Sequence, residues 1–267
     1  MFNKILIGRF MPGDSWIHRL DARTKLIISI LFIFVIFLAT SVPAYLVAIA
    51  FTLFVIWLTG LGFGVFLRGV RPLLFLMFFT TLLQVFFVTT GDVLWQWGLI
   101  KITTDGLING VAIFVRFMLI IMFSTVLTLT TQPLEIADAM EAIMNPLKKI
   151  GVPVAELALM ISIALRFVPT LLDEAETIMN AQRARGVLFN EGKMINRIKA
   201  FVPLLIPLFI NAIKRAIELG DAMEARGYRG GDHRTKYRVL TWHKQDTQAV
   251  VGFVVFVVVL VVTAVLH

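Results

Sequence analysis

Long apolar runs alternate with short polar segments over most of the chain. The runs of bilayer-crossing length lie at about 25–40, 44–60, 72–90, 106–130 and 247–266. Because about 17–25 apolar residues suffice for a helix to cross a bilayer, the pattern predicts five transmembrane helices. The short segment Ser41-Val42-Pro43 should join the first two as a hairpin. The connection at 91–105 is predicted to be a loop, whose Trp95 and Trp97 suit a membrane interface.

The block 131–246 has a different pattern, which predicts three further helices. The first opens at Thr131-Gln132-Pro133, with proline near the first turn, and stops at Gly151-Val152-Pro153. The second should cover about 153–185 and the third about 193–226. Each of these two is apolar in its first half and amphipathic in its second half, where apolar residues recur at three-four spacing.

We expect the apolar halves of the two long helices to lie in or just under the bilayer face, and not to cross it. Glu156 and Arg166 interrupt the first of these halves and count against a transmembrane helix. The amphipathic halves should then project into the cytosol. Pro169, Pro203 and Pro207 lie inside the two patterns and are expected to bend or break the helices locally.

Charge fixes the expected orientation. The chain carries a net charge of +8, yet only 16% of its residues are charged and 58% are hydrophobic. Sixteen of its 25 Lys and Arg residues fall in 131–246, and five more precede residue 26. Because cytoplasmic loops retain basic residues, the N-terminus and this block should be cytoplasmic and the C-terminus outside. The basic residues are not interleaved with exposed aromatics, so nucleic acid is not an expected partner.

Arg116 is the exception, because it lies near the middle of the fourth apolar run. A charged side chain at this depth is expensive and is normally directed at protein. Two alternatives stay open from the sequence: a buried structural pairing, or a role in docking another membrane subunit. Outside the runs, Asp21 is a plausible helix N-cap, followed by Arg23 and Lys25. Glu174 and its acidic neighbours suit a solvated face, or pairing with Arg183 or the third helix.

One tripeptide occurs twice in matching places. Ala184-Arg185-Gly186 ends the second cytoplasmic helix, and Ala225-Arg226-Gly227 ends the third. Each Arg should lie in a last turn beside the carbonyl end of the helix dipole, and each Gly where a left-handed C-cap is favoured. One such tripeptide would be an ordinary helix end. Two copies, 41 residues apart on sister helices, indicate a two-pronged contact with two similar sockets.

Catalytic and metal-binding patterns are absent from the sequence. It has no cysteine, no GxxxxGK[ST] phosphate loop and no HExxH, and its four histidines are scattered. We therefore expect no catalytic residue, no metal site and no cofactor bound by this chain. The competing classes are an intramembrane enzyme, a substrate-conducting permease and a membrane scaffold. The first two should place several ionisable groups inside the spans, which here offer little beyond Arg116 and Gln84.

Taken together, these motifs resemble the transmembrane T component of energy-coupling factor (ECF) transporters, the ABC-type importers of vitamins and metal ions. The matching segments, in order, are Leu20-Asp21-Ala22-Arg23-Thr24-Lys25-Leu26, Thr131-Gln132-Pro133, Ile163-Ala164-Leu165-Arg166-Phe167-Val168-Pro169-Thr170, Ala181-Gln182-Arg183-Ala184-Arg185-Gly186 and Ala225-Arg226-Gly227-Tyr228. Ala22 departs from the proline usual in the family. Pro12-Gly13-Asp14-Ser15 resembles the shared, vitamin-type version.

The resemblance implies an all-α polytopic membrane protein, with a cytoplasmic coupling domain of three helices, two of them long. Residues 1–130 would hold four transmembrane helices, 131–246 the coupling domain and 247–267 the last transmembrane helix. It also implies a multi-pass protein of a bacterial cell membrane.

The implied partners are two ABC-type ATPase subunits, which would hold ATP and Mg²⁺, and one exchangeable substrate-binding membrane subunit. The residues Ala184, Arg185 and Gly186 would engage one ATPase, and Ala225, Arg226 and Gly227 the other. Apolar faces lined by Leu159, Ile163, Leu204 and Phe209 would hold the substrate-binding subunit, while Asp21, Arg23, Arg166 and Pro169 would support the coupling.

Overall fold

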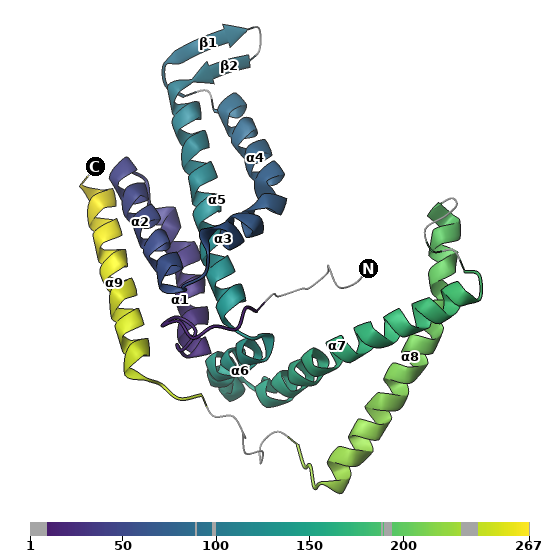
Figure 1. The fold of residues 1–267 in the computed structure, drawn as a ribbon. Coiled ribbons are helices and arrows are strands. Elements are labelled where there is room, and N and C mark those ends of the chain that lie inside the picture. The colour runs from purple at the N-terminus through teal and green to yellow at the C-terminus, as the bar shows by residue number, and fades with distance from the viewer. Residues whose placement is uncertain are drawn as a thin grey trace. The chain divides into compact units, whose positions relative to one another are not determined.

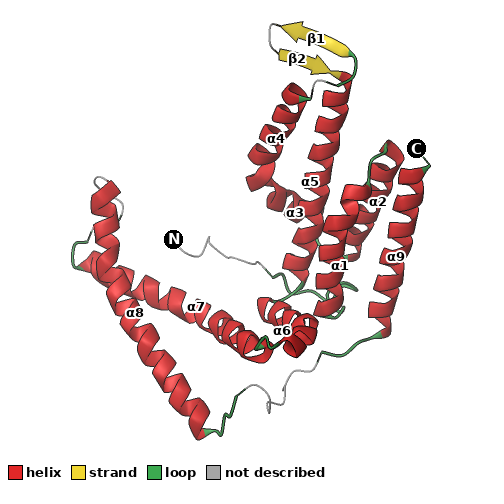
Figure 2. Cartoon of the chain, turned by 180° about the vertical axis from the view of Figure 1, so that it is seen from behind, coloured by secondary structure: helices red, strands yellow, loops and turns green. Residues whose placement is uncertain are grey.

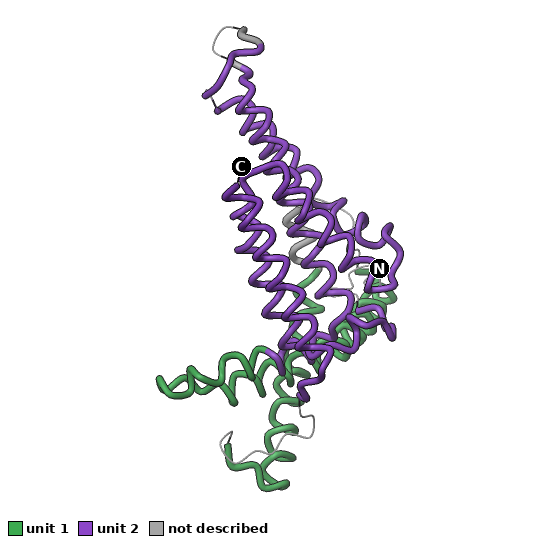
Figure 3. Tube along the Cα trace, turned by 90° about the vertical axis from the view of Figure 1, so that its left-hand side faces the viewer, with its two compact units in different colours: residues 1–7, 140–239 green, residues 8–139, 240–267 purple. Residues whose placement is uncertain are grey.

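Helices make up nearly all of the computed structural model, which describes residues 10–88, 90–97, 100–187, 189, 194–230 and 240–266. The predicted all-α class is therefore confirmed. The chain forms two compact units, drawn in different colours in Figure 3. Unit 1 comprises Met1–Ile7 and Met140–Val239, and unit 2 comprises Gly8–Ala139 and Leu240–His267.

Unit 2 contains the helices that correspond to the five predicted spans (Figure 1). They are α1 (Ala22–Val35) with its extension η2 (Ile36–Leu38), α2 (Val42–Leu58), α3 (Phe63–Val70) running through η3 (Arg71–Leu73) into α4 (Leu74–Phe87), α5 (Thr104–Thr130) and α9 (Lys244–Val265). Helix α6 (Pro133–Met144) begins where the first cytoplasmic helix was predicted, directly after Gln132.

Within the described residues, four helical stretches are long and apolar enough to cross a membrane. They are Phe63–Phe87, Thr104–Thr130, Val154–Ala184 and Lys244–Val265, with Val42–Leu58 as a shorter apolar helix. The protein is thus membrane-embedded. The apolar first half of Val154–Ala184 is the part predicted to lie at the bilayer face, because Glu156 and Arg166 interrupt it. That placement stays a prediction.

Stacked phenylalanines hold the core of unit 2 together. The rings of Phe32 and Phe123 lie 4.0 Å apart between centroids, and those of Phe51 and Phe256 lie 4.1 Å apart. These four side chains come from α1, α5, α2 and α9. Offset or parallel aromatic pairs add about 0.5–1.5 kcal/mol beyond the burial of their area. The last helix is therefore a core element of the unit, although it follows the first by about 200 residues.

Two glycines allow α4 and α5 to approach closely. Gly106 and Gly110 are one turn apart on α5, in the small-xxx-small spacing typical of membrane helix contacts. A Cβ on Gly110 would lie 2.9 Å from Cγ2 of Val85, and one on Gly106 would lie 3.1 Å from the Val85 carbonyl oxygen. Any larger side chain must therefore push the two helices apart.

We expect Gly110→Leu to destabilise unit 2 by roughly 1–3 kcal/mol, the usual cost of overpacking. A thermal unfolding scan in detergent would show this as a lower Tm. Gly252→Leu on α9 is the matched control, because a Cβ there would have no atom within 4 Å. Equal losses in both variants would contradict close packing at Gly110.

The segment predicted as a loop at 91–105 contains a β-hairpin, so that prediction was wrong. Strand β1 (Val93–Trp97) pairs antiparallel with β2 (Ile100–Thr103), with Val93 opposite Thr103. The hairpin follows α4 and leads into α5 (Figure 2). The reason is composition: valine, tryptophan, isoleucine and threonine favour extended backbone, which a search for apolar runs does not detect. The interfacial role of Trp95 and Trp97 stays a prediction.

Unit 1 contains η4 (Asn145–Ile150), α7 (Val154–Ala184) and α8 (Met194–Ala225), close to the predicted bounds. Gly151 ends η4 in a left-handed conformation with φ of 88°. Neither long helix is broken: α7 continues through Pro169, and α8 through Pro203 and Pro207. The expectation was a local bend or break; no break occurs, and a bend stays a prediction. A proline removes only one donor from a ladder of about 30 residues, so the remaining helical hydrogen bonds continue the helix.

Candidate functional site

The C-terminal ends of α7 and α8 have the same backbone geometry. Gly186 and Gly227 adopt φ of 86° and 79°, and their N–H groups donate to the carbonyls of Arg183 and Glu224, both at 2.9 Å. One residue further, Val187 and Tyr228 donate back to Gln182 and Met223, both at 3.0 Å. This pair of bonds is the Schellman cap. The predicted left-handed caps are confirmed at both ends.

We call residues 184–186 and 225–227 the tips, and each tip carries one arginine. Arg185 and Arg226 are exposed, as are Ala184 and Ala225 beside them. Among the described residues, neither guanidinium donates a hydrogen bond within the chain. The tips lie apart at the ends of their helices (Figure 1). A free guanidinium next to small side chains is suited to charge-assisted bonds with a partner's carboxylates or carbonyls.

The left-handed caps should make both glycines sensitive to substitution by alanine. Gly186→Ala and Gly227→Ala should each cost about 1 kcal/mol locally, because a Cβ is strained at positive φ. The effect should appear as faster hydrogen exchange at the amides of Val187 and Tyr228, which close the caps. Gly220→Ala, in the interior of α8 with no atom within 4 Å of its Cβ, is the control and should slow exchange or leave it unchanged. Unchanged exchange in both tip variants would contradict this account.

The two helices are joined by a polar contact one turn wide. Glu174 on α7 accepts one hydrogen bond from Nδ2 of Asn211 and another from Nη2 of Arg215, the latter at 3.5 Å. The Arg215 guanidinium also lies 5.8 Å from the centroid of the Phe167 ring. Of the alternatives left open for Glu174, the structure supports pairing with the third helix.

The residues expected to line the apolar docking face differ in how exposed their side chains are. Phe209 is 67% exposed, while Leu159 and Ile163 are half-buried. Leu204, however, is only 6% exposed, because it packs against Met179 and Phe189 inside unit 1. Its side chain holds α8 to α7 and does not reach a partner in this conformation.

Several apolar side chains of α8 are exposed. They are Val202, Leu205, Ile206, Phe209, Ile213 and Ile217, all at least 44% exposed. Contiguous exposed apolar surface of this kind indicates a membrane or protein contact. The remaining predicted support residues of α7, Arg166 and Pro169, are exposed.

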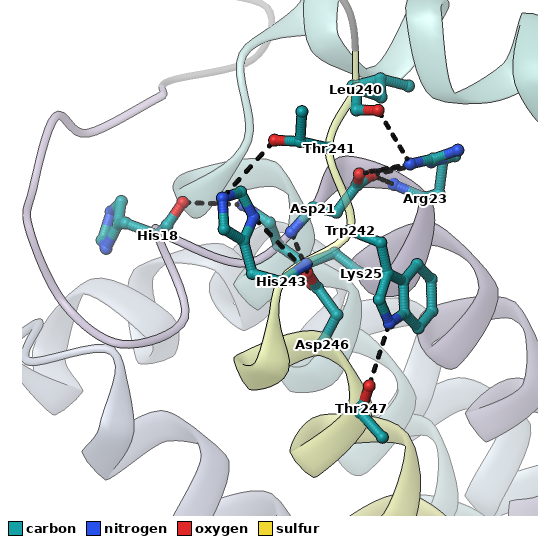
Figure 4. A network of polar contacts seen from close by, with 10 residues as sticks. All are labelled: His18, Asp21, Arg23, Lys25, Leu240, Thr241, Trp242, His243, Asp246 and Thr247. Carbon is teal, nitrogen blue, oxygen red and sulfur yellow. Dashed lines mark hydrogen bonds and ion pairs between the residues drawn. The ribbon is translucent and has the colours of Figure 1, made fainter.

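A polar network joins the starts of α1 and α9 in unit 2 (Figure 4). Asp21 caps α1 by accepting from the N–H of Arg23, and its carboxylate also accepts from the Arg23 guanidinium at 2.8 Å. The N–H of Asp21 donates to Oδ1 of Asp246 at 2.8 Å, and Oδ2 of Asp246 accepts from the N–H of His243 at 2.8 Å. Lys25 Nζ donates to the carbonyls of His18 and Thr130.

The same network shifts the protonation of Asp21 and Arg23. Burial acts to raise the pKa of Asp21, but hydrogen bonds from Arg23 outweigh it and hold that pKa below its usual value. The Asp21 carboxylate in turn raises the pKa of Arg23. Both groups are therefore charged at physiological pH.

Asp246 is the residue in this network that the sequence argument missed. It is fully buried, and it occupies the third position of α9 in a capping box with His243. The signal in the sequence was an acidic residue just before the last span, three positions after a possible cap. Its bond to the backbone of Asp21, 225 residues away, could not be read from any local pattern.

For Arg116 the structure shows a pairing within the chain, and a role in docking another membrane subunit stays a prediction. Its Nη2 donates to the hydroxyl of Tyr45 at 2.7 Å and to the carbonyl of Ala39 at 3.2 Å. The guanidinium also lies 5.0 Å from the centroid of the Phe37 ring. Its charge therefore packs against the connection between α1 and α2.

The chain is similar to known membrane proteins along most of its length. A family model described as "Cobalt transport protein" (CbiQ) matches residues 13–237. A protein of Lacticaseibacillus paracasei named "Energy-coupling factor transporter transmembrane protein EcfT" is 58% identical, with 95% of this chain and 96% of that protein covered. Proteins of the same name from Lactobacillus helveticus and Bacillus subtilis are 53% and 48% identical, over 98% and 97% of this chain and 95% and 98% of theirs.

Proposed function

The chain belongs to the CbiQ family, as a transmembrane T component of energy-coupling factor transporters, and from this premise we propose that it couples two ATPase subunits to a substrate-binding membrane subunit. In this proposal the ATPases hold ATP and Mg²⁺, and this chain transmits motion without catalysing a reaction. The cargo would be a vitamin or another micronutrient, and the substrate-binding subunit would be exchangeable. The N-terminus and the block 131–246 would face the cytoplasm.

The observation that supports this proposal most strongly is the pair of matched tips. Arg185 and Arg226 end sister helices with the same Schellman cap, and both are exposed. A single exposed arginine on a helix end is common, whereas two with the same cap suit two copies of similar sockets. ABC-type ATPases act in pairs, which matches the number of tips.

The coupling would be mechanical. When ATP binding closes the ATPase pair, the distance between its two sockets changes. Tips that are held there by charge-assisted hydrogen bonds must follow, so α7 and α8 change their crossing angle. The exposed apolar side chains of α8, with Phe209 among them, would carry that motion to the substrate-binding subunit. Because apolar contacts have few directional bonds, such a surface tolerates both sliding and exchange of partners.

Site-specific crosslinking tests this proposal directly, because the chain has no cysteine of its own. In the complex, Ala184→Cys and Ala225→Cys should each crosslink to an ATPase subunit that carries cysteines in its groove. Lys214→Cys, at an exposed position in the middle of α8, should not. If no ATPase crosslinks or copurifies with the complex, the proposal fails. Uptake by the chain alone in vesicles would favour the alternative of a substrate-conducting permease, and binding of partners without uptake would favour a scaffold.

A further inference from the structure

The contact between Glu174 and α8 lies at a special place along both long helices. Glu174 precedes Arg185 by 11 residues, and Arg215 precedes Arg226 by 11 residues. At a rise of 1.5 Å per residue, each arm from the contact to its tip is about 16 Å long. Eleven residues also make about three turns, so each tip arginine lies on nearly the same face of its helix as the contact residue. Measured from Glu174 and Arg215 the two arms are therefore equal, whereas Asn211 precedes Arg226 by 15 residues.

The geometry of the contact restricts how the two helices can turn. The two carboxylate oxygens of Glu174 accept from Asn211 and Arg215, which are one turn apart on α8. A carboxylate that bridges one turn in this way fixes both the register and the rotation of one helix against the other. Among the described residues, the apolar contact between the helices in this region includes Met179 against Leu204 and has no such direction, and Arg215 also lies over the ring of Phe167.

From this we propose that Glu174 and Arg215 are positioning residues, which set the angle at which α7 crosses α8 and thereby the distance between the tips. The inference rests on the proposed function, since it assigns the pivot of the motion that the tips would transmit. With arms of about 16 Å, a change of about 10° in the crossing angle moves the tips by about 2–3 Å relative to each other. A small shift at the pivot is thus sufficient to alter a fit between tips and sockets.

One nitrogen of the contact is left without a partner in this arrangement. The second terminal nitrogen of Arg215, Nη1, is buried and has no hydrogen-bond partner. A buried donor without a partner is costly, so another crossing angle that supplied an acceptor would gain a hydrogen bond. The side chains of Arg215 and Glu174 are also 32% and 21% exposed, which leaves room for movement. The contact therefore defines one arrangement without preventing a second.

The test measures the distance between the tips and the coupling ratio in the same complexes. Spin labels on Ala181→Cys and Ala222→Cys, exposed positions one turn before each tip arginine, report the distance between the tips in the assembled transporter. Glu174→Gln and Arg215→Met should broaden or shift this distance. They should also lower the substrate transported per ATP hydrolysed by about fivefold, the scale of losing a partly exposed charge-assisted contact. The charge exchange Glu174→Arg with Arg215→Glu should restore much of both.

The matched controls are Asp173→Asn and Lys214→Gln, which remove the same charges from the adjacent, exposed positions. They should change neither the distance nor the coupling ratio. A wild-type distance and ratio in both Glu174→Gln and Arg215→Met would overturn the pivot. In that case copurified ATPases and wild-type uptake would still support the proposed function. Failure of the proposed function itself would appear as wild-type complexes that contain no ATPase. If one pivot variant does not assemble, the distance between the tips and the coupling ratio are compared in the other variant and in the charge exchange.

Discussion

The double variant Arg185→Glu with Arg226→Glu is expected to abolish ATP-driven uptake while the protein still inserts into the membrane. Both side chains are exposed and make no hydrogen bond to the described part of the chain, so their reversal should not disturb the fold. At a socket, however, each glutamate would replace an attraction by a repulsion and leave the partner's acceptors unpaired. Losing one buried charge-assisted contact typically costs 2–5 kcal/mol, so two reversals should reduce uptake by more than about 100-fold. Uptake of radiolabelled substrate into proteoliposomes measures this.

The control for this variant is Arg183→Glu with Arg229→Glu. These residues lie beside the same two tips and are exposed, so the change in net charge and its location match closely. If the tip arginines act through specific bonds, the control should keep most of its uptake. Equal loss in both double variants would reduce the effect to general electrostatics. Normal uptake in the Arg185 and Arg226 double variant would remove the coupling role of the tips.

Features that depend on neighbouring residues were predictable from the sequence. The ends of α7 and α8 followed from glycines after long helical patterns, since only glycine adopts a left-handed cap without strain. The start of α6 followed from proline in the first turn, whereas its end at Met144, before η4, was not predicted. Helices at the five apolar runs followed from the composition of those runs, and that all five cross the membrane stays a prediction. In each case the physical cause lies within a few residues of the feature.

Features that depend on distant residues were not predictable in this way. Leu204 lies in an apolar pattern that suits a partner, and only the fold shows that it packs on Met179 instead. Glu174 had several possible partners, and the crossing of α7 and α8 selects Asn211 and Arg215. For the same reason, the tips could be identified from the sequence, whereas the contact proposed to set their distance could not.

Replacing Asp246 is expected to give the largest loss of stability in unit 2. Its carboxylate is fully buried and accepts from two backbone N–H groups, those of Asp21 and His243. In Asp246→Ala both donors lose their partner. The buried N–H of Asp21, left unpaired, costs about 1–3 kcal/mol, and the lost helix cap at the exposed His243 costs about 1 kcal/mol more. We therefore expect a loss of about 2–4 kcal/mol in the free energy of unfolding, seen as a lower Tm in detergent. The start of α9 should also exchange its amides faster, because its capping box is gone.

Two further variants separate the hydrogen bonds of Asp246 from a general effect of removing an acid. Asp246→Asn keeps one acceptor oxygen and should recover about half of the lost stability. Asp14→Ala removes an exposed acid of the same unit and should change stability by less than about 0.5 kcal/mol. If Asp246→Ala unfolds at the wild-type temperature, the bond between Asp246 and the backbone of Asp21 does not hold α9 to α1. The packing of Phe256 against Phe51 would then be the contact that places the last helix, because it links α9 to α2.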